Sequence, residues 1–132
     1  MTFDWSAFLH LAEALESGAG NGELEDARYR SAISRAYYAA FCSARDHLRH
    51  ELGHDHIPRQ GAHEYVRRQF QGLRRVRGEY RVVGAYLRRL HVARAEADYN
   101  SEWRADLSGA ARIAIADCRR VLQSLEAVRS EA

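Results

Sequence analysis

The 132-residue chain contains no lysine, so all 20 of its basic residues are arginine. It has one proline and one methionine, and no run of apolar residues approaches the ~20 that a membrane-spanning helix needs. Two cysteines, Cys42 and Cys118, are too few for a disulfide framework and suit a reducing compartment. The first ten residues show neither a basic leader nor an apolar run. We therefore expect a cytoplasmic protein with no membrane segment.

Valine, isoleucine and threonine are scarce, whereas alanine, leucine, arginine and glutamate are abundant, which is typical of helices. Hydrophobic residues make up 46% of the chain and charged residues 29%, as in ordinary globular domains. At this length we expect one domain, covering residues 1–132, with a single core.

Apolar residues recur at helical spacing in five segments. These segments cover residues 5–15, 23–52, 65–73, 82–97 and 107–128. A glycine-rich stretch at residues 18–22 separates the first two, and Gly53 is placed to end the second. Short connections favour antiparallel neighbours, so the sequence predicts an all-α fold, an up-and-down bundle of four to five helices.

The net charge of +2 conceals an uneven distribution. Between His63 and Arg94, nine arginines stand against two acidic residues. Such a surface is either a solvated face or a binding surface for phosphate or for an acidic protein, both of which guanidinium groups bind in a forked geometry. Tyr80 and Tyr86 lie among these arginines and could stack on bases, although Tyr86 also fits the apolar stripe.

Two short strings stand out. One runs from Arg30 to Phe41 and ends in Tyr37-Tyr38-Ala39-Ala40-Phe41, and the other is Arg94-Ala95-Glu96-Ala97-Asp98-Tyr99. Tyr37 and Phe41 lie one turn apart, and we expect Tyr37 in the core with its hydroxyl hydrogen-bonded. Arg94 and Asp98, at positions i and i+4, are within reach of an ion pair, which on a surface has little consequence. Tyr99 follows where the helix is expected to fray.

In their order and spacing, the two strings resemble the HEPN family (higher eukaryotes and prokaryotes nucleotide-binding), in particular its small stand-alone prokaryotic branch. There a Tyr-Tyr-Ala-x-Phe segment precedes an Arg-x-x-Ala-Asp-Tyr segment, and His63 stands where a histidine recurs ahead of the third helix. The resemblance covers about residues 28–128. It implies a helical homodimer, often paired with a minimal nucleotidyltransferase in a toxin–antitoxin module.

The resemblance also implies a site for RNA or a nucleotide, in which Arg94 contacts phosphate, Asp98 orients Arg94, and Tyr99 or Tyr38 stacks or hydrogen-bonds. The candidate catalytic residues are Arg94, Asp98, Tyr99 and His63, and the candidate nucleotide- or RNA-binding residues are Arg35, Tyr38, Arg88 and His91.

Ribonuclease members of the family carry an arginine, four to six residues and then a histidine, and this pattern is absent here. Residues 99–101, where the histidine would follow Arg94, are tyrosine, asparagine and serine. Two hypotheses stay open. One is a metal-independent endoribonuclease in which His63 or His91 supplies the missing histidine. The other is a non-catalytic helical dimerisation module that binds a nucleotide or a partner protein.

Four histidines near the end of the second segment could converge on a zinc or nickel ion, or could simply be polar surface. They are His47, His50, His54 and His56. The glycine-rich stretch lacks lysine and follows no strand, so it is no phosphate-binding loop. We expect no cofactor and no resident metal.

Overall fold

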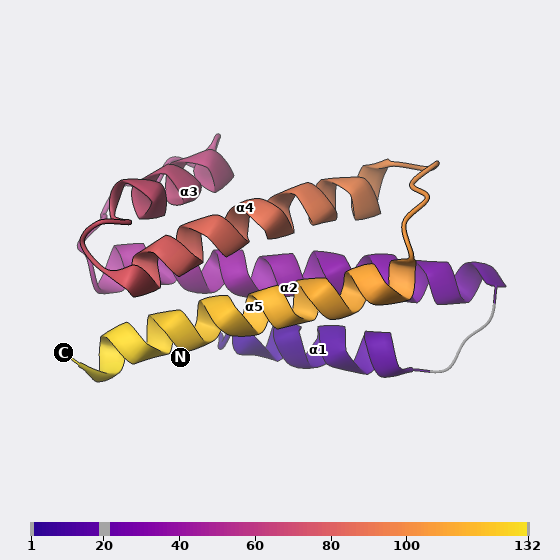
Figure 1. Ribbon diagram of the computed structural model, residues 1–132. Helices are drawn as coiled ribbons and strands as arrows, with labels where there is room; N and C mark the ends of the chain where they lie inside the picture. The colour runs from indigo at the N-terminus through magenta and orange to yellow at the C-terminus, as the bar shows by residue number, and fades with distance from the viewer. Residues whose placement is uncertain (1, 19–21, 132) are drawn as a thin grey trace.

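The computed structural model describes residues 2–18 and 22–131, which form five α-helices and, within those ranges, no strand (Figure 1). The helices are α1 (Ser6–Ser17), α2 (Gly22–His50), α3 (Ala62–Gly72), α4 (Gly78–Tyr99) and α5 (Leu107–Ser130). The predicted all-α bundle is confirmed, and each predicted segment corresponds to one helix. The glycine-rich stretch that separates the first two helices lies largely outside the described residues.

Four of the helices, α1, α2, α4 and α5, form an antiparallel bundle. Helix α2 packs on α1, α4 and α5, and α5 also packs on α1 and α4. The short helix α3 lies outside this bundle, against α4 and the end of α2 (Figure 1). Among the described residues, no helix combines the length and the apolar character needed to cross a membrane.

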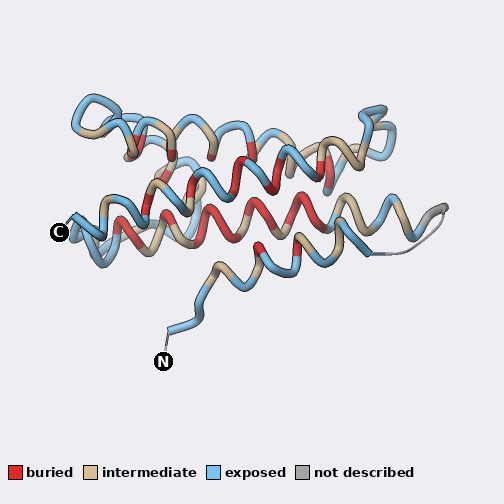
Figure 2. Tube along the Cα trace, turned by 60° about the horizontal axis from the view of Figure 1, so that its bottom comes forward, coloured by how far each residue is buried: buried red, intermediate tan, exposed pale blue. Residues whose placement is uncertain are grey.

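Small side chains let α2 approach its neighbours closely. Its alanines at five positions are fully buried, namely Ala32, Ala36, Ala39, Ala40 and Ala44. Larger residues of the same helix, such as Ile33 and Leu48, are also fully buried and belong to the same core. Figure 2 shows the buried residues following the helix faces that are turned toward one another. The helix ends at His50, and Gly53 takes the left-handed conformation, with φ of +73°, that turns the chain away.

A buried polar pair joins α2 to the start of α4. His47 Nε2 lies 2.9 Å from the hydroxyl of Tyr80, and the two residues are only 5% and 4% exposed. The prediction that Tyr80 stacks on bases is therefore wrong, because its ring is part of the core. Tyr86 is half-buried, and the guanidinium groups of Arg89 and Arg120 lie over its ring.

Enlarging one of the buried alanines tests how closely α2 is packed. We expect Ala40→Leu to lower the free energy of unfolding by about 1–3 kcal/mol, because a fully packed core must move to admit the larger side chain. Ala27→Leu, at an exposed position of the same helix, is the control and should change it by less than about 0.5 kcal/mol. Urea denaturation followed by circular dichroism measures both, and equal effects would contradict the packing argument.

Candidate functional site

Side chains from three helices meet over the C-terminal half of α4. Tyr38 comes from α2 and His63 from the start of α3, while Arg94 and Asp98 come from α4 itself. The two strings singled out in the sequence thus lie side by side in the fold, together with the histidine between them.

Arg94 lies at the centre of this cluster. Its Nε is 2.8 Å from Asp98 Oδ2, an ion pair in which the N–H is not aligned for a hydrogen bond, and its Nη2 donates to the Tyr38 hydroxyl at 2.9 Å. The guanidinium carbon lies 5.3 Å from the ring centres of both Tyr38 and Tyr99, within range of cation–π attraction. The Arg94 side chain is 19% exposed and that of Asp98 26%, so the pair is half-buried rather than a freely solvated surface pair.

Arg30 of α2 fixes the end of α4. Its Nη1 donates to the carbonyl oxygens of Ala97 and Asn100, at 2.9 Å each, so that a cation satisfies carbonyls at the helix C-terminus. This contact determines where Asp98 and Tyr99 stand. The sequence gives no sign of this role of Arg30, because a side chain that binds backbone carbonyls leaves no partner residue type to recognise.

Two histidines lie beside Arg94. The ring of His63 stacks on Phe41, with 4.2 Å between ring centres, and lies 6.4 Å from the ring of His91. Burial lowers the pKa of both histidines, and the nearby cations Arg94 and Arg67 lower it further. Both are therefore uncharged at neutral pH.

Tyr37 is 1% exposed, and its hydroxyl is hydrogen-bonded to His63 Nδ1, which confirms that it is a core residue with a satisfied hydroxyl. Burial raises the pKa of this hydroxyl, so it stays protonated and can donate to Nδ1. Neutral His63 then carries its own proton on Nε2. Tyr37 thereby fixes the orientation of the His63 ring within the cluster.

The remaining predicted residues lie at the edges of the cluster. Arg35 places its guanidinium carbon 5.1 Å from the ring centre of Tyr38 and 4.8 Å from that of Phe8. Arg88 is exposed, one turn before His91 on α4, and it lines a separate shallow pocket between α3 and α4. The structure therefore brings all the predicted site residues together except Arg88, which lies on the adjoining face.

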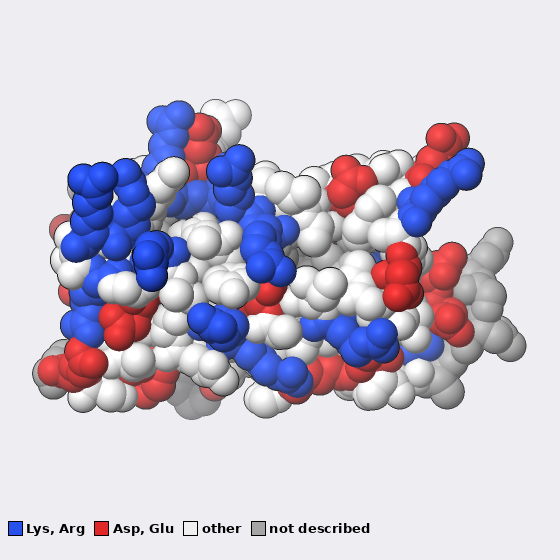
Figure 3. Space-filling model, viewed as in Figure 1, with Lys and Arg blue, Asp and Glu red and all other residues white. Residues whose placement is uncertain are grey.

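Basic side chains gather on one part of the surface. Figure 3 shows them over α3 and the neighbouring half of α4, as the distribution of arginine along the sequence predicts. The cluster around Arg94 lies beside this basic surface, since His91 belongs to both the cluster and the α3–α4 pocket.

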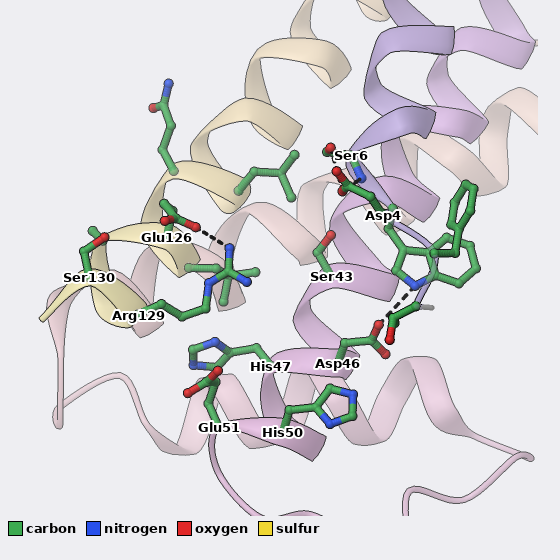
Figure 4. A pocket seen from close by; sticks show the side chains of 17 residues that line it. Asp4, Ser6, Ser43, Asp46, His47, His50, Glu51, Glu126, Arg129 and Ser130 are labelled. Atoms are coloured by element: carbon green, nitrogen blue, oxygen red, sulfur yellow. Dashed lines mark hydrogen bonds and ion pairs between the residues drawn. The ribbon is translucent and has the colours of Figure 1, made fainter. Parts of the chain in front are cut away.

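A cavity of about 840 Å³ lies elsewhere, between the N-terminal residues, α2 and the end of α5 (Figure 4). Its lining includes four carboxylates against one arginine, namely Asp4, Asp46, Glu51 and Glu126 against Arg129. Asp46 accepts a hydrogen bond from Trp5 Nε1 at 3.0 Å, and Arg129 is paired with Glu126. Because Arg129 is already paired with Glu126, this cavity suits a phosphate less well than the surface around Arg94 does.

The four histidines near the end of α2 do not converge. His47 is bonded to Tyr80, His54 Nδ1 is bonded to the Tyr65 hydroxyl at 2.6 Å, and His50 and His56 are exposed. Within residues 2–18 and 22–131, no group of three or more His, Cys, Asp or Glu side chains is arranged to hold a metal ion. The structure therefore does not support the hypothesis of a zinc or nickel site there.

The family model of the HEPN domain matches residues 18–128, which is most of the chain. The chain belongs to the HEPN domain family, whose members are generally concerned with nucleotides or RNA and often dimerise. No curated protein and no solved structure matches the chain significantly. The family predicted from the two strings is thus confirmed.

Acidification should destabilise the fold. Burial holds the pKa of His47, His63 and His91 below the ordinary value of 6.5, so below about pH 6.5 the unfolded chain binds more protons than the folded one. The stability that these neutral histidines contribute is present above that pH. It is lost as the pH falls from 6.5 through the lowered pKa values of the folded protein. We expect the melting temperature to drop between pH 7 and pH 5, and the double variant His63→Gln/His91→Gln to flatten the drop. A melting temperature that rises on acidification would contradict this.

Proposed function

We propose that this HEPN domain binds RNA or a nucleotide through the cluster around Arg94, with a phosphate on Arg94 and a base on Tyr38 or Tyr99. The observation that carries the proposal is the state of the Arg94 guanidinium. Asp98 and Tyr38 fix its orientation, yet its Nη1 makes no hydrogen bond to any described residue, and the side chain still reaches solvent. An oriented, partly free guanidinium suits a phosphate oxygen.

The surroundings of Arg94 fit the rest of such a ligand. Tyr99 is 73% exposed, so its ring is available to stack on a base. His63 and His91 supply ring nitrogens that can hydrogen-bond to phosphate or ribose. Asp98 neutralises part of the charge of Arg94, which keeps the arginine in place when no ligand is bound.

We also propose that the domain acts as a homodimer whose interface includes the exposed face of α4, so that two copies of the site share a cleft. Val92 is 57% exposed and Tyr99 73%, which places apolar surface on that face. In this proposal the protein is a cytoplasmic component of a toxin–antitoxin-like or defence module, with a nucleotidyltransferase as its antitoxin partner. The alternative is a non-catalytic dimerisation module, which would use the same cleft to bind a nucleotide or a partner protein.

A second function, metal-independent RNA cleavage, is favoured by the two histidines beside Arg94. Of the two, only neutral His91 has a ring nitrogen free to take the proton of a 2′-hydroxyl, because His63 accepts from Tyr37 at Nδ1 and carries its proton on Nε2. Arg94 can stabilise the charge on phosphorus, while the leaving 5′-oxygen needs a proton from an acid. Because both histidines have a lowered pKa, neither is readily protonated at neutral pH to serve as that acid. Any cleavage should therefore be slow at pH 7, and binding is the function that the geometry supports best.

Replacing Arg94 tests the proposed site. We expect Arg94→Ala to weaken binding of 5′-AMP and of a ten-nucleotide single-stranded RNA at least about tenfold, because alanine cannot form the charge-assisted hydrogen bonds to phosphate. The same substitution removes the half-buried ion pair with Asp98 and should therefore lower the free energy of unfolding by about 1 kcal/mol. Arg94→Lys keeps the charge but not the fork, and should bind with intermediate affinity.

Arg88→Ala serves as the control for this experiment, since it removes an exposed arginine one turn before His91 and should change AMP affinity less than twofold. Calorimetry measures binding and thermal denaturation measures stability. If Arg94→Ala lowers the melting temperature while binding per folded molecule is unchanged, Arg94 is a structural residue and the site assignment fails.

Analytical ultracentrifugation at micromolar concentration tests the dimer. We expect a species of about twice the 15.1 kDa chain mass, because exposed apolar side chains on α4 become buried when two copies associate. Val92→Glu should shift the population to monomer. Val76→Glu, at a 67% exposed position between α3 and α4, is the matched control and should leave the dimer intact. A wild-type monomer would rule out the shared cleft.

A further inference from the structure

Two of the side chains that line the shallow pocket between α3 and α4, about 260 Å³ in volume, each have a buried nitrogen without a hydrogen-bond partner. Arg67 Nη1 and His91 Nδ1 are both buried, and neither forms a hydrogen bond to any described residue. A buried guanidinium N–H without an acceptor is costly. Both atoms lie beneath the surface of the pocket. A small shift of the two side chains would let one oxygen-rich ligand accept from Arg67 and, when the imidazole proton is on Nδ1, from His91 as well.

The charge in the pocket selects an anion. Arg67, Arg68 and Arg88 line it, and Glu64 is the one acidic residue of the lining. Glu64 is paired with Arg68 at 2.9 Å, and both side chains are more than half exposed on the rim. The remaining charge of the lining comes from Arg67 and Arg88, which together with neutral His91 form a set that fits a phosphate group.

This pocket adjoins the cluster around Arg94. His91 belongs to both, because its ring packs near His63 on one side and lines the pocket on the other. Arg88 and Arg94 are six residues apart on α4, which is about 9 Å along the helix axis. The charge of Arg67 also reaches the cluster, since it helps lower the pKa of both His91 and His63. Two anion-binding positions thus lie side by side with His91 between them.

We propose that the α3–α4 pocket binds a second phosphate, next to the one held by Arg94, and that the ligand is accordingly a single strand of RNA with at least two phosphates rather than a free mononucleotide. This inference rests on the proposed function, because it takes the phosphate on Arg94 as its starting point. Arg67 is the principal contact, and Arg88 closes the pocket from α4.

The test compares the same ten-nucleotide RNA, measured by fluorescence anisotropy, with 5′-AMP, measured by calorimetry. We expect the double variant Arg67→Met/Arg88→Ala to weaken RNA binding at least about tenfold and to leave AMP affinity within twofold. Methionine keeps the apolar stem of Arg67, and the melting temperature confirms that the variant is folded. The slope of log affinity against log salt should fall by about 0.7 for each phosphate that the variant no longer neutralises.

Arg75→Ala is the charge control, because Arg75 is an exposed arginine of the same basic stretch that does not line the pocket. If Arg75→Ala combined with Arg74→Ala weakens RNA binding as much as the pocket variant, the surface acts through diffuse charge and the pocket proposal is overturned. Equal losses for RNA and AMP in the pocket variant would also overturn it, since the pocket would then serve the first phosphate. Failure of the wild-type protein to bind either probe overturns the proposed function and this inference together.

Discussion

A ladder of polar contacts between α2 and α4 holds the candidate site in place. Residues four apart on α2 each meet the last turns of α4: Arg30 binds the carbonyls of Ala97 and Asn100, the Ser34 hydroxyl lies 3.4 Å from Asp98, and Tyr38 accepts from Arg94. The antiparallel packing of the two helices sets this register, and the buried alanines of α2 allow the close approach. The orientation of Arg94 thus depends on how α2 and α4 pack in the core.

The charges of the molecule are sorted by location. Arginine side chains concentrate over α3 and the adjoining part of α4, whereas a group of carboxylates lines the cavity at the end of α5. The net charge of +2 therefore says little about what the surface can bind. A polyanion approaching the molecule meets an attractive face and a repulsive one, which orients the encounter before any specific contact forms.

Helical periodicity was sufficient to predict the five helices, because each helix buries one apolar stripe and is bounded by glycine or polar residues. It also predicted the pairing of Arg94 with Asp98, which depends only on their spacing along one helix. The roles of Arg30, Arg67 and Tyr80 were not predictable in this way. Arg30 binds backbone atoms, one nitrogen of Arg67 is buried without a partner, and the hydroxyl of Tyr80 is hydrogen-bonded to a histidine 33 residues away. Each of these roles arises from contacts between helices, about which a single sequence carries little information.

The basic surface over α3 and α4 is built from guanidinium groups alone, because the chain has no lysine. A guanidinium keeps its charge over the whole pH range in which the protein can be studied, and it is not a substrate for acetylation in the way that an ammonium is. The charge that arginine gives this surface is therefore insensitive to pH and beyond the reach of lysine-modifying enzymes. For the same reason, no side chain of this surface reacts with amine-directed cross-linkers or dyes, so contacts made here have to be mapped with reagents specific for arginine or for carboxylates.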